Sequence, residues 1–156
     1  MKNIRCKNYQ IHINNWIELT SFLHHEDPSS VFIIVDENTE KYCLHLVLEH
    51  LDIPVQVIRI PSGEQNKNLT TCQHIWTNLM RYGADRHSLV INLGGGVIGD
   101  LGGFCAATYM RGIRFVQVPT TLLSQADASV GGKLGIDLMG FKNMIGLLRE
   151  DSRMEY

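Results

Sequence analysis

The chain has 156 residues, of which 44% are hydrophobic and 19% charged, and its formal net charge is −2. These values are those of an ordinary soluble globular protein, and they exclude a disordered or fibrous chain. The 14 basic residues are balanced by 16 acidic ones and form no basic stripe, which argues against nucleic acid as a partner.

The apolar stretches are short. The longest, such as residues 31–35 and 89–93, fall far below the roughly 20 residues that a membrane-spanning helix needs. The polar N-terminus, residues 1–10, lacks the apolar centre of a signal peptide. The sequence therefore predicts a cytoplasmic protein without a membrane partner.

Cysteines and histidines do not have the spacing of a metal site. Cys6, Cys43, Cys72 and Cys105 are widely separated and form no CxxC pair, so they are expected to be reduced, mostly buried thiols. The seven histidines include no HExxH motif, and surface or packing roles are expected for them. No metal ligand is predicted in the chain.

Hydrophobic patterning predicts strands and helices that alternate along the chain. In chain order we expect a strand at 10–13, a helix at 16–23, a strand at 31–35, a helix at 40–50 capped by Asn38 or Thr39, a strand at 55–60, a helix at 69–81, a strand at 89–93, a helix at 97–109 and a strand at 115–118. This order indicates the α/β class, with a Rossmann-like parallel sheet flanked by helices in one domain, residues 1–156. The glycine-dense segment after Pro119 is expected to be irregular and outside the core.

A glycine turn is placed between the strand at 89–93 and the following helix. Gly94, Gly96 and Gly99 satisfy the GxGxxG pattern at the position where a dinucleotide site needs it. Glycines there let the backbone approach a pyrophosphate, and the N–H groups at the helix start favour negative charge. The alternative is a tight strand-to-helix turn that binds nothing.

Two features depart from an ordinary Rossmann site. No acid ends the next strand, which closes at Val118 and Pro119, so the usual ribose-binding carboxylate is missing there. Asp100, directly after the third glycine, would repel a phosphate at the helix start. Asp36, at the end of the strand at 31–35, is another candidate acid, and spacing alone leaves it open as a ligand contact or as a residue favoured by the helix dipole.

Six short blocks, in order and at matching intervals, resemble the 3-dehydroquinate synthase family. They are Pro61-Ser62-Gly63-Glu64-Gln65-Asn66-Lys67, Gly94-Gly95-Gly96-Val97-Ile98-Gly99-Asp100, Ala107-Thr108-Tyr109-Met110-Arg111-Gly112, Gln117-Val118-Pro119-Thr120-Thr121-Leu122-Leu123, Asp127-Ala128-Ser129-Val130-Gly131-Gly132-Lys133 and Lys142-Asn143-Met144-Ile145-Gly146. The resemblance implies a shikimate-pathway lyase that makes 3-dehydroquinate and phosphate from 3-deoxy-D-arabino-heptulosonate 7-phosphate. It implies NAD as a transient oxidant and a zinc ion as cofactors.

The resemblance also implies roles for individual residues. Contacts to NAD are implied for Asp36, Ser62, Gly63, Glu64, Gln65, Asn66, Lys67, Gly95, Gly96, Val97, Ile98, Gly99, Asp100, Thr120 and Thr121. Lys133, Lys142 and Asn143 would lie between cofactor and sugar-phosphate substrate, with Asp127 as a further active-site acid. Arg111 resembles an arginine that reaches the substrate phosphate across a homodimer interface.

The family's zinc ligands lie in a C-terminal helical domain, and only residues 147–156 follow the last block here. That polar tail does not resemble the family's continuation, so we expect a nucleotide-binding domain that lacks the helical domain and has little or no cyclase activity alone. Two alternatives are another sugar-phosphate cyclase or glycerol-dehydrogenase-like enzyme, and a non-catalytic NAD-binding or interaction module.

Overall fold

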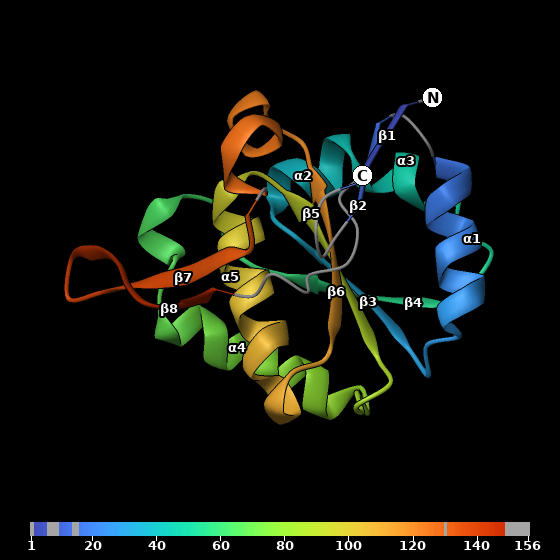
Figure 1. The fold of residues 1–156 in the computed structure, drawn as a ribbon. Helices are drawn as coiled ribbons and strands as arrows, with labels where there is room; N and C mark the ends of the chain where they lie inside the picture. Colours follow the sequence, from blue (N-terminus) through green and yellow to red (C-terminus); the bar gives the residue numbers. More distant parts are fainter. Residues whose placement is uncertain (1, 6–9, 14–15, 130, 149–156) are drawn as a thin grey trace.

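The computed structural model describes residues 2–5, 10–13, 16–129 and 131–148. Its centre is a parallel sheet of β3 (Val31–Val35), β4 (Val55–Arg59), β5 (Leu89–Gly94) and β6 (Arg114–Pro119), arranged in the order β4-β3-β5-β6 (Figure 1). Every residue of β3 and β5 is buried because these central strands are covered on both faces. The expected parallel sheet is confirmed.

Two hydrophobic clusters, one on each face, hold helices against this sheet. On one face α4 (Leu69–Arg81) and α5 (Gly96–Thr108) pack against alternate strand residues such as Phe32 and Ile34. On the other face α1 (Trp16–Glu26) and α3 (Leu44–Leu48) pack against the intervening residues, such as Ile33 and Val35. Because successive side chains of a strand point to opposite faces of the sheet, alternate residues of the same strand belong to two separate cores.

The helix expected at 40–50 is wrong in its extent. The structure has α2 (Glu37–Tyr42) and α3, which are separated at Cys43, where φ is −123° and ψ is −33°. The cap of α2 is Asp36, not Asn38 or Thr39, because the Asp36 side chain accepts the N–H groups of both.

A two-stranded ribbon precedes α1. It pairs β1 (Lys2–Arg5), which we did not expect, with β2 (Gln10–Ile13), which we did. Across the described part of the chain, no helix has the length and apolar character that a membrane crossing requires.

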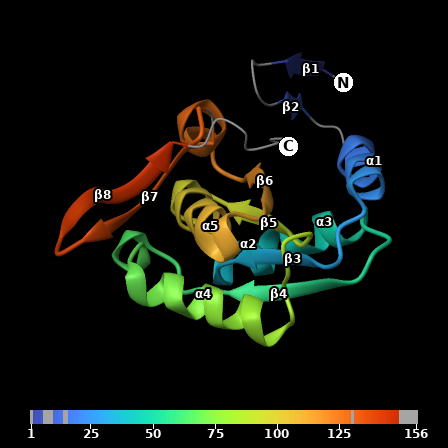
Figure 2. The ribbon, with the colours of Figure 1, turned by 60° about the horizontal axis from the view of Figure 1, so that its bottom comes forward.

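The segment after Pro119 is more regular than expected. It forms a π-helical turn, η3 (Ser124–Ala128), and an antiparallel hairpin of β7 (Lys133–Leu138) and β8 (Phe141–Leu148). Leu134 and Ile136 alternate along β7 and are buried against α5, beside which the hairpin lies in Figure 2. The expectation of an irregular non-core segment was wrong because two alternating apolar residues are too weak a strand signal among so many glycines.

The cysteines are free thiols where the structure describes them. Cys72 and Cys105 are buried and Cys43 is half-buried, as expected, while Cys6 lies outside the described residues. Cys72 on α4 and Cys105 on α5 face one another in the core, and desolvation raises the pKa of the Cys105 thiol. These thiols are therefore packing groups in the contact between the two helices.

Candidate functional site

The candidate site lies at the carboxyl edge of the sheet, where the direction of strand addition reverses. The chain passes from β3 outward to β4 and then returns to form β5 on the opposite side of β3. Open α/β sheets bind ligands in the crevice at such a reversal. Asp36 follows β3 there, Gly95 follows β5, and Thr120 follows β6 with its N–H bonded to the Gly94 oxygen at 3.0 Å.

The glycine turn opens α5 as the sequence predicted. Gly95 is the N-cap, with φ −77° and ψ −170°, and the N–H of Gly99 makes the first intrahelical bond to the Gly95 oxygen at 3.0 Å. The N–H groups of the first helical turn therefore point out of the helix end, where they favour an anion. A Cβ on Gly95 would lie 3.2 Å from Cγ2 of Thr121, so a side chain here would crowd the space between the two predicted contact segments.

A buried lysine joins three of the predicted blocks. Lys67, whose side chain is 4% exposed, donates from Nζ to Oδ2 of Asp100 at 2.5 Å and to Oδ1 of Asn143 at 2.7 Å. Burial raises the pKa of Asp100, while its bond to Lys67 lowers it part of the way back. The sequence placed all three residues in a site but missed this pairing, because nothing in their spacing says that they meet.

The Lys67–Asp100 pair changes the interpretation of the glycine turn. From sequence, Asp100 was expected to repel a phosphate at the start of α5. In the structure a cation lies directly on its carboxylate, so the pair presents much less negative charge than a lone aspartate would. The acid beside the turn is therefore compatible with an anionic ligand.

The loop that follows β4 is bound to its neighbours at both ends. Its 3-10 turn, η1 (Glu64–Asn66), follows Ser62, whose N–H donates to the carboxylate of Glu37 on α2 at 2.9 Å. At the other side, Glu64 and Lys142 on β8 form an exposed ion pair at 3.2 Å. The loop thus connects α2, beside Asp36, to the hairpin.

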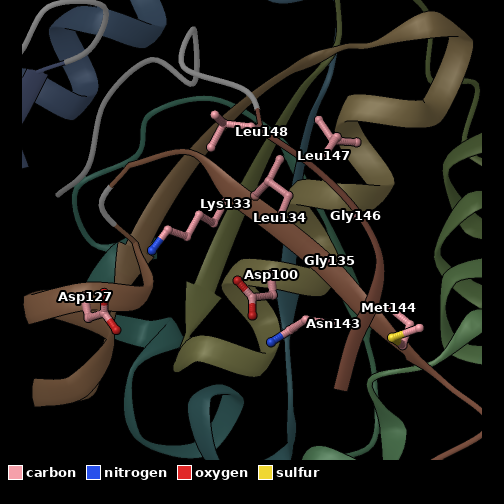
Figure 3. A pocket seen from close by; sticks show the side chains of 10 residues that line it. All are labelled: Asp100, Asp127, Lys133, Leu134, Gly135, Asn143, Met144, Gly146, Leu147 and Leu148. Atoms are coloured by element: carbon pink, nitrogen blue, oxygen red, sulfur yellow. The ribbon is translucent and has the colours of Figure 1, made fainter. Parts of the chain in front are cut away.

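A pocket of about 640 Å³ lies between the hairpin, α5 and the η3 turn (Figure 3). Asp127 and Lys133 are both exposed, and Figure 3 shows the Lys133 side chain extending toward the side where Asp127 lies. The residues that line it are Asp100, Asp127, Lys133, Leu134, Gly135, Asn143, Met144, Gly146, Leu147 and Leu148. Four of these, Asp100, Asp127, Lys133 and Asn143, were assigned to the site from sequence.

Asp36 serves as a helix cap in the structure. Its Oδ1 accepts the N–H groups of Asn38 at 3.0 Å and Thr39 at 2.8 Å, and the Thr39 hydroxyl accepts the Asp36 N–H at 3.0 Å. This reciprocal capping box favours the structural interpretation that the sequence left open. Both bonds to the carboxylate end on Oδ1, so Oδ2 takes no part in the cap.

Arg111 is not brought to the pocket. It ends η2 (Tyr109–Arg111), which follows the C-terminal end of α5 and so lies toward the amino ends of the strands, away from the candidate site. Its φ of 71° and that of Met110, 51°, are both in the left-handed region, which L-residues with side chains rarely adopt. Within one chain, therefore, Arg111 and the pocket lie near opposite ends of α5.

No metal site can be built from the described residues, since among them no three His, Cys, Asp or Glu side chains gather in a group that could hold an ion.

The fold and this site define a Rossmann-like α/β domain, with a glycine turn at the switch point of its sheet and, beside the turn, an aspartate paired with a lysine of the same chain. A profile of the family described as 3-dehydroquinate synthase N-terminal matches residues 57–154. The chain belongs to this family.

Related proteins are considerably longer. The 3-dehydroquinate synthase of Rhodopirellula baltica is 56% identical over 123 residues, which are 77% of this chain and 33% of that protein. That of Ruminiclostridium cellulolyticum is 44% identical over 150 residues, 92% of this chain and 42% of that protein. The chain thus spans about a third to two fifths of their length.

A solved structure supports the fold over nearly the whole chain. A 2-deoxy-scyllo-inosose synthase complexed with carbaglucose-6-phosphate, NAD+ and Co2+ superposes with a TM-score of 0.87 at 25% identity, over 99% of this chain and 44% of that one. The family profile also extends to residue 154. This corrects the expectation that the tail departs from the family, although residues 149–156 lie outside the described ones.

Proposed function

We propose that this chain is the NAD-binding N-terminal part of a 3-dehydroquinate synthase, which converts 3-deoxy-D-arabino-heptulosonate 7-phosphate to 3-dehydroquinate and phosphate in the shikimate pathway. The observation that carries the proposal is the meeting of Lys67, Asp100 and Asn143, from three separate blocks, beside the glycine turn. Three residues that the family resemblance assigns to one site thus lie in contact with one another. When bound, NAD would supply a reversible acceptor for the hydride on the carbon that carries a substrate hydroxyl group, while the hydroxyl itself gives up a proton.

The chain's residues fit a dinucleotide. The absence of a side chain at Gly95 keeps the space before Thr121 open, and the first-turn N–H groups of α5 can donate to a pyrophosphate. Lys67 neutralises Asp100 at the same place. We assign the NAD contacts to the Ser62–Lys67 loop, the Gly95–Asp100 turn and the threonines Thr120 and Thr121. Asp36 would contact the ribose through Oδ2, the carboxylate oxygen that takes no part in the helix cap.

The pocket and its margin suit the sugar phosphate. Lys133 in the pocket, and Lys142 outside its lining and paired with Glu64, supply point charges for carboxylate or phosphate groups. The Asp127 carboxylate can accept hydrogen bonds from hydroxyl groups, and the Asn143 amide can accept or donate them. Arg111, at the far edge of its own sheet, would serve the substrate phosphate of a second copy in a homodimer. In this proposal the metal is held by the part of the relatives that this chain does not span.

Titration of the purified chain with NAD tests the proposal. A ligand that binds only the native state stabilises it by about 2.7 kcal/mol when the free ligand concentration is 100 times the Kd. Thermal unfolding readily detects a change of this size. Gly95→Val, which fills the space before Thr121, is expected to abolish the shift, while Met80→Ala, which shortens an exposed side chain at the far end of α4, is the control. No heat and no thermal shift at millimolar NAD would contradict the proposal and favour a non-catalytic module.

The catalytic half of the proposal has its own test. The chain alone, with NAD and zinc, is expected to give little or no turnover of the heptulosonate phosphate, because it spans only a third to two fifths of its relatives. The 2-deoxy-scyllo-inosose synthase likeness makes another sugar-phosphate cyclase the second candidate. A version completed with the rest of a relative's sequence, assayed on the heptulosonate phosphate and on the substrates of other sugar-phosphate cyclases, distinguishes 3-dehydroquinate synthase activity from that of another cyclase.

A further inference from the structure

Asp137 makes contacts that no predicted role accounts for. It lies on β7 where the pairing with β8 is irregular, between Ile136 and Leu138. Its carboxylate Oδ1 accepts the backbone N–H of Asn143 at 2.8 Å, and its own N–H donates to the backbone oxygen of Lys67 at 2.8 Å. One residue therefore holds both the backbone of Lys67 and the backbone of the residue that Lys67 binds.

Asn143 needs such support. Its φ is 53°, in the left-handed region that is unfavourable for residues with a side chain, although asparagine tolerates it better than most. In this conformation its Oδ1 accepts from Lys67 Nζ at 2.7 Å. In the same conformation the Asn143 N–H donates to the Asp137 carboxylate, so this bond restrains the backbone from which the Lys67 contact is made.

We infer that Asp137 is a positioning residue for the cofactor edge: it holds Asn143 in its left-handed conformation and thereby fixes Lys67, and through Lys67 the Asp100 carboxylate, beside the glycine turn. The inference rests on the proposed NAD-binding function. Asp137 itself acts only through Asn143 and Lys67. Removal of its carboxylate would free Asn143 to leave Lys67, whose Nζ would then be held by Asp100 alone, while the backbone bond from the Asp137 N–H to Lys67 would remain.

A merely structural role would look different. The hairpin has other sources of stability, since Leu134 and Ile136 are buried against α5 and pair with Leu147 and Ile145 on β8. Asp137→Ala is therefore expected to leave the fold intact while altering the conformation at Asn143. Asp137→Asn keeps an oxygen acceptor in place and is expected to behave like the native chain.

The test is a double-variant cycle read by NAD affinity in isothermal titration. Loss of one hydrogen bond corresponds to roughly a twofold to tenfold weakening. Asp137→Ala is expected to weaken NAD binding by this factor, and Asp137→Asn to restore it. Because Asp137 acts through Asn143, adding Asp137→Ala to Asn143→Ala is expected to cost nothing further. Asp52→Ala, which removes a carboxylate far from the site, is the matched control.

A second readout does not depend on NAD. Backbone NMR of the free chain reports the left-handed conformation of Asn143 and the exchange of its N–H, which is expected to quicken in Asp137→Ala and not in Asp137→Asn. Unchanged affinity, additive losses in the cycle or an unaltered Asn143 signal would each overturn the inference. A native chain that binds no NAD would refute the proposed function instead, and the NMR result would still decide whether Asp137 sets the backbone of Asn143.

Discussion

Replacing Lys67 by methionine would remove the cation from Asp100 and keep most of the buried side-chain volume. Lys67 is 4% exposed and donates to Asp100 and to Asn143 at 2.5 and 2.7 Å. Bonds that involve a charged group contribute about 1.5–3 kcal/mol each. The Asp100 side chain is 19% exposed, so water recovers part of the loss, and we expect the free energy of unfolding to fall by about 2–3 kcal/mol near neutral pH.

The loss is expected to depend on pH. Burial raises the pKa of Asp100 in the folded state, and removing Lys67 raises it further. The folded state then binds the Asp100 proton more tightly than the unfolded state does. It therefore loses stability as the pH rises from the ordinary aspartate pKa through the raised one. The cost of Lys67→Met is thus full at neutral pH and shrinks as the solution is acidified.

Urea unfolding followed by tryptophan fluorescence, at about pH 7.5 and about pH 5, measures both effects. The double variant Lys67→Met/Asp100→Asn has no carboxylate to desolvate and is expected to recover much of the loss. An equal loss at both pH values, or a double variant no more stable than Lys67→Met, would refute the reasoning and assign the cost to packing.

Three further predictions follow from single contacts. Gly102→Ala would place Cβ 2.1 Å from Oδ1 of Asn92 and is expected to cost about 1–3 kcal/mol in urea unfolding; no loss would contradict the close contact of α5 with β5. Asp36→Ala is expected to lower the free energy of unfolding by about 1 kcal/mol because the cap is lost, and Asp36→Asn to leave it almost unchanged. Weaker NAD binding by Asp36→Asn, which keeps the cap, would therefore indicate the ribose contact. The hydrogen bond from His24 is the main cause that lowers the pKa of Asp52. Its contribution is present above the ordinary aspartate pKa and is lost as the pH falls through the lowered one, so Asp52→Asn should flatten the acid limb of the stability curve.

Local patterning was sufficient for most of the architecture. β3 and β5 are continuous apolar runs, and α4 carries one apolar face, so their types and approximate bounds could be predicted. The same reasoning failed for the hairpin, whose apolar residues are few and separated by glycines. It failed again at Cys43, because the break between α2 and α3 has no glycine or proline to signal it.

From sequence the candidate site is a set of proposed residues without an arrangement. The blocks around Lys67, Asp100 and Asn143 were found from sequence because each matches a family pattern at its own position. That Lys67 Nζ binds the other two could not be found, since the contacts join residues 33 and 76 positions apart. Asp137 was missed because its two bonds, to the N–H of Asn143 six positions away and to the backbone oxygen of Lys67, depend on the irregular hairpin pairing and on where the hairpin lies.

The sequence by itself determined the alternation of strands and helices, the glycine turn that opens α5 and the family, because these depend on neighbouring residues and on short motifs. Only the tertiary structure decided that Asp36 caps α2, that Lys67 neutralises Asp100 and that Arg111 lies at the far edge of the sheet. These follow from the order β4-β3-β5-β6 and from the packing of the hairpin on α5, which bring distant segments to one edge and carry Arg111 away from it. Charge pairing and burial are properties of that assembled edge, not of any one segment.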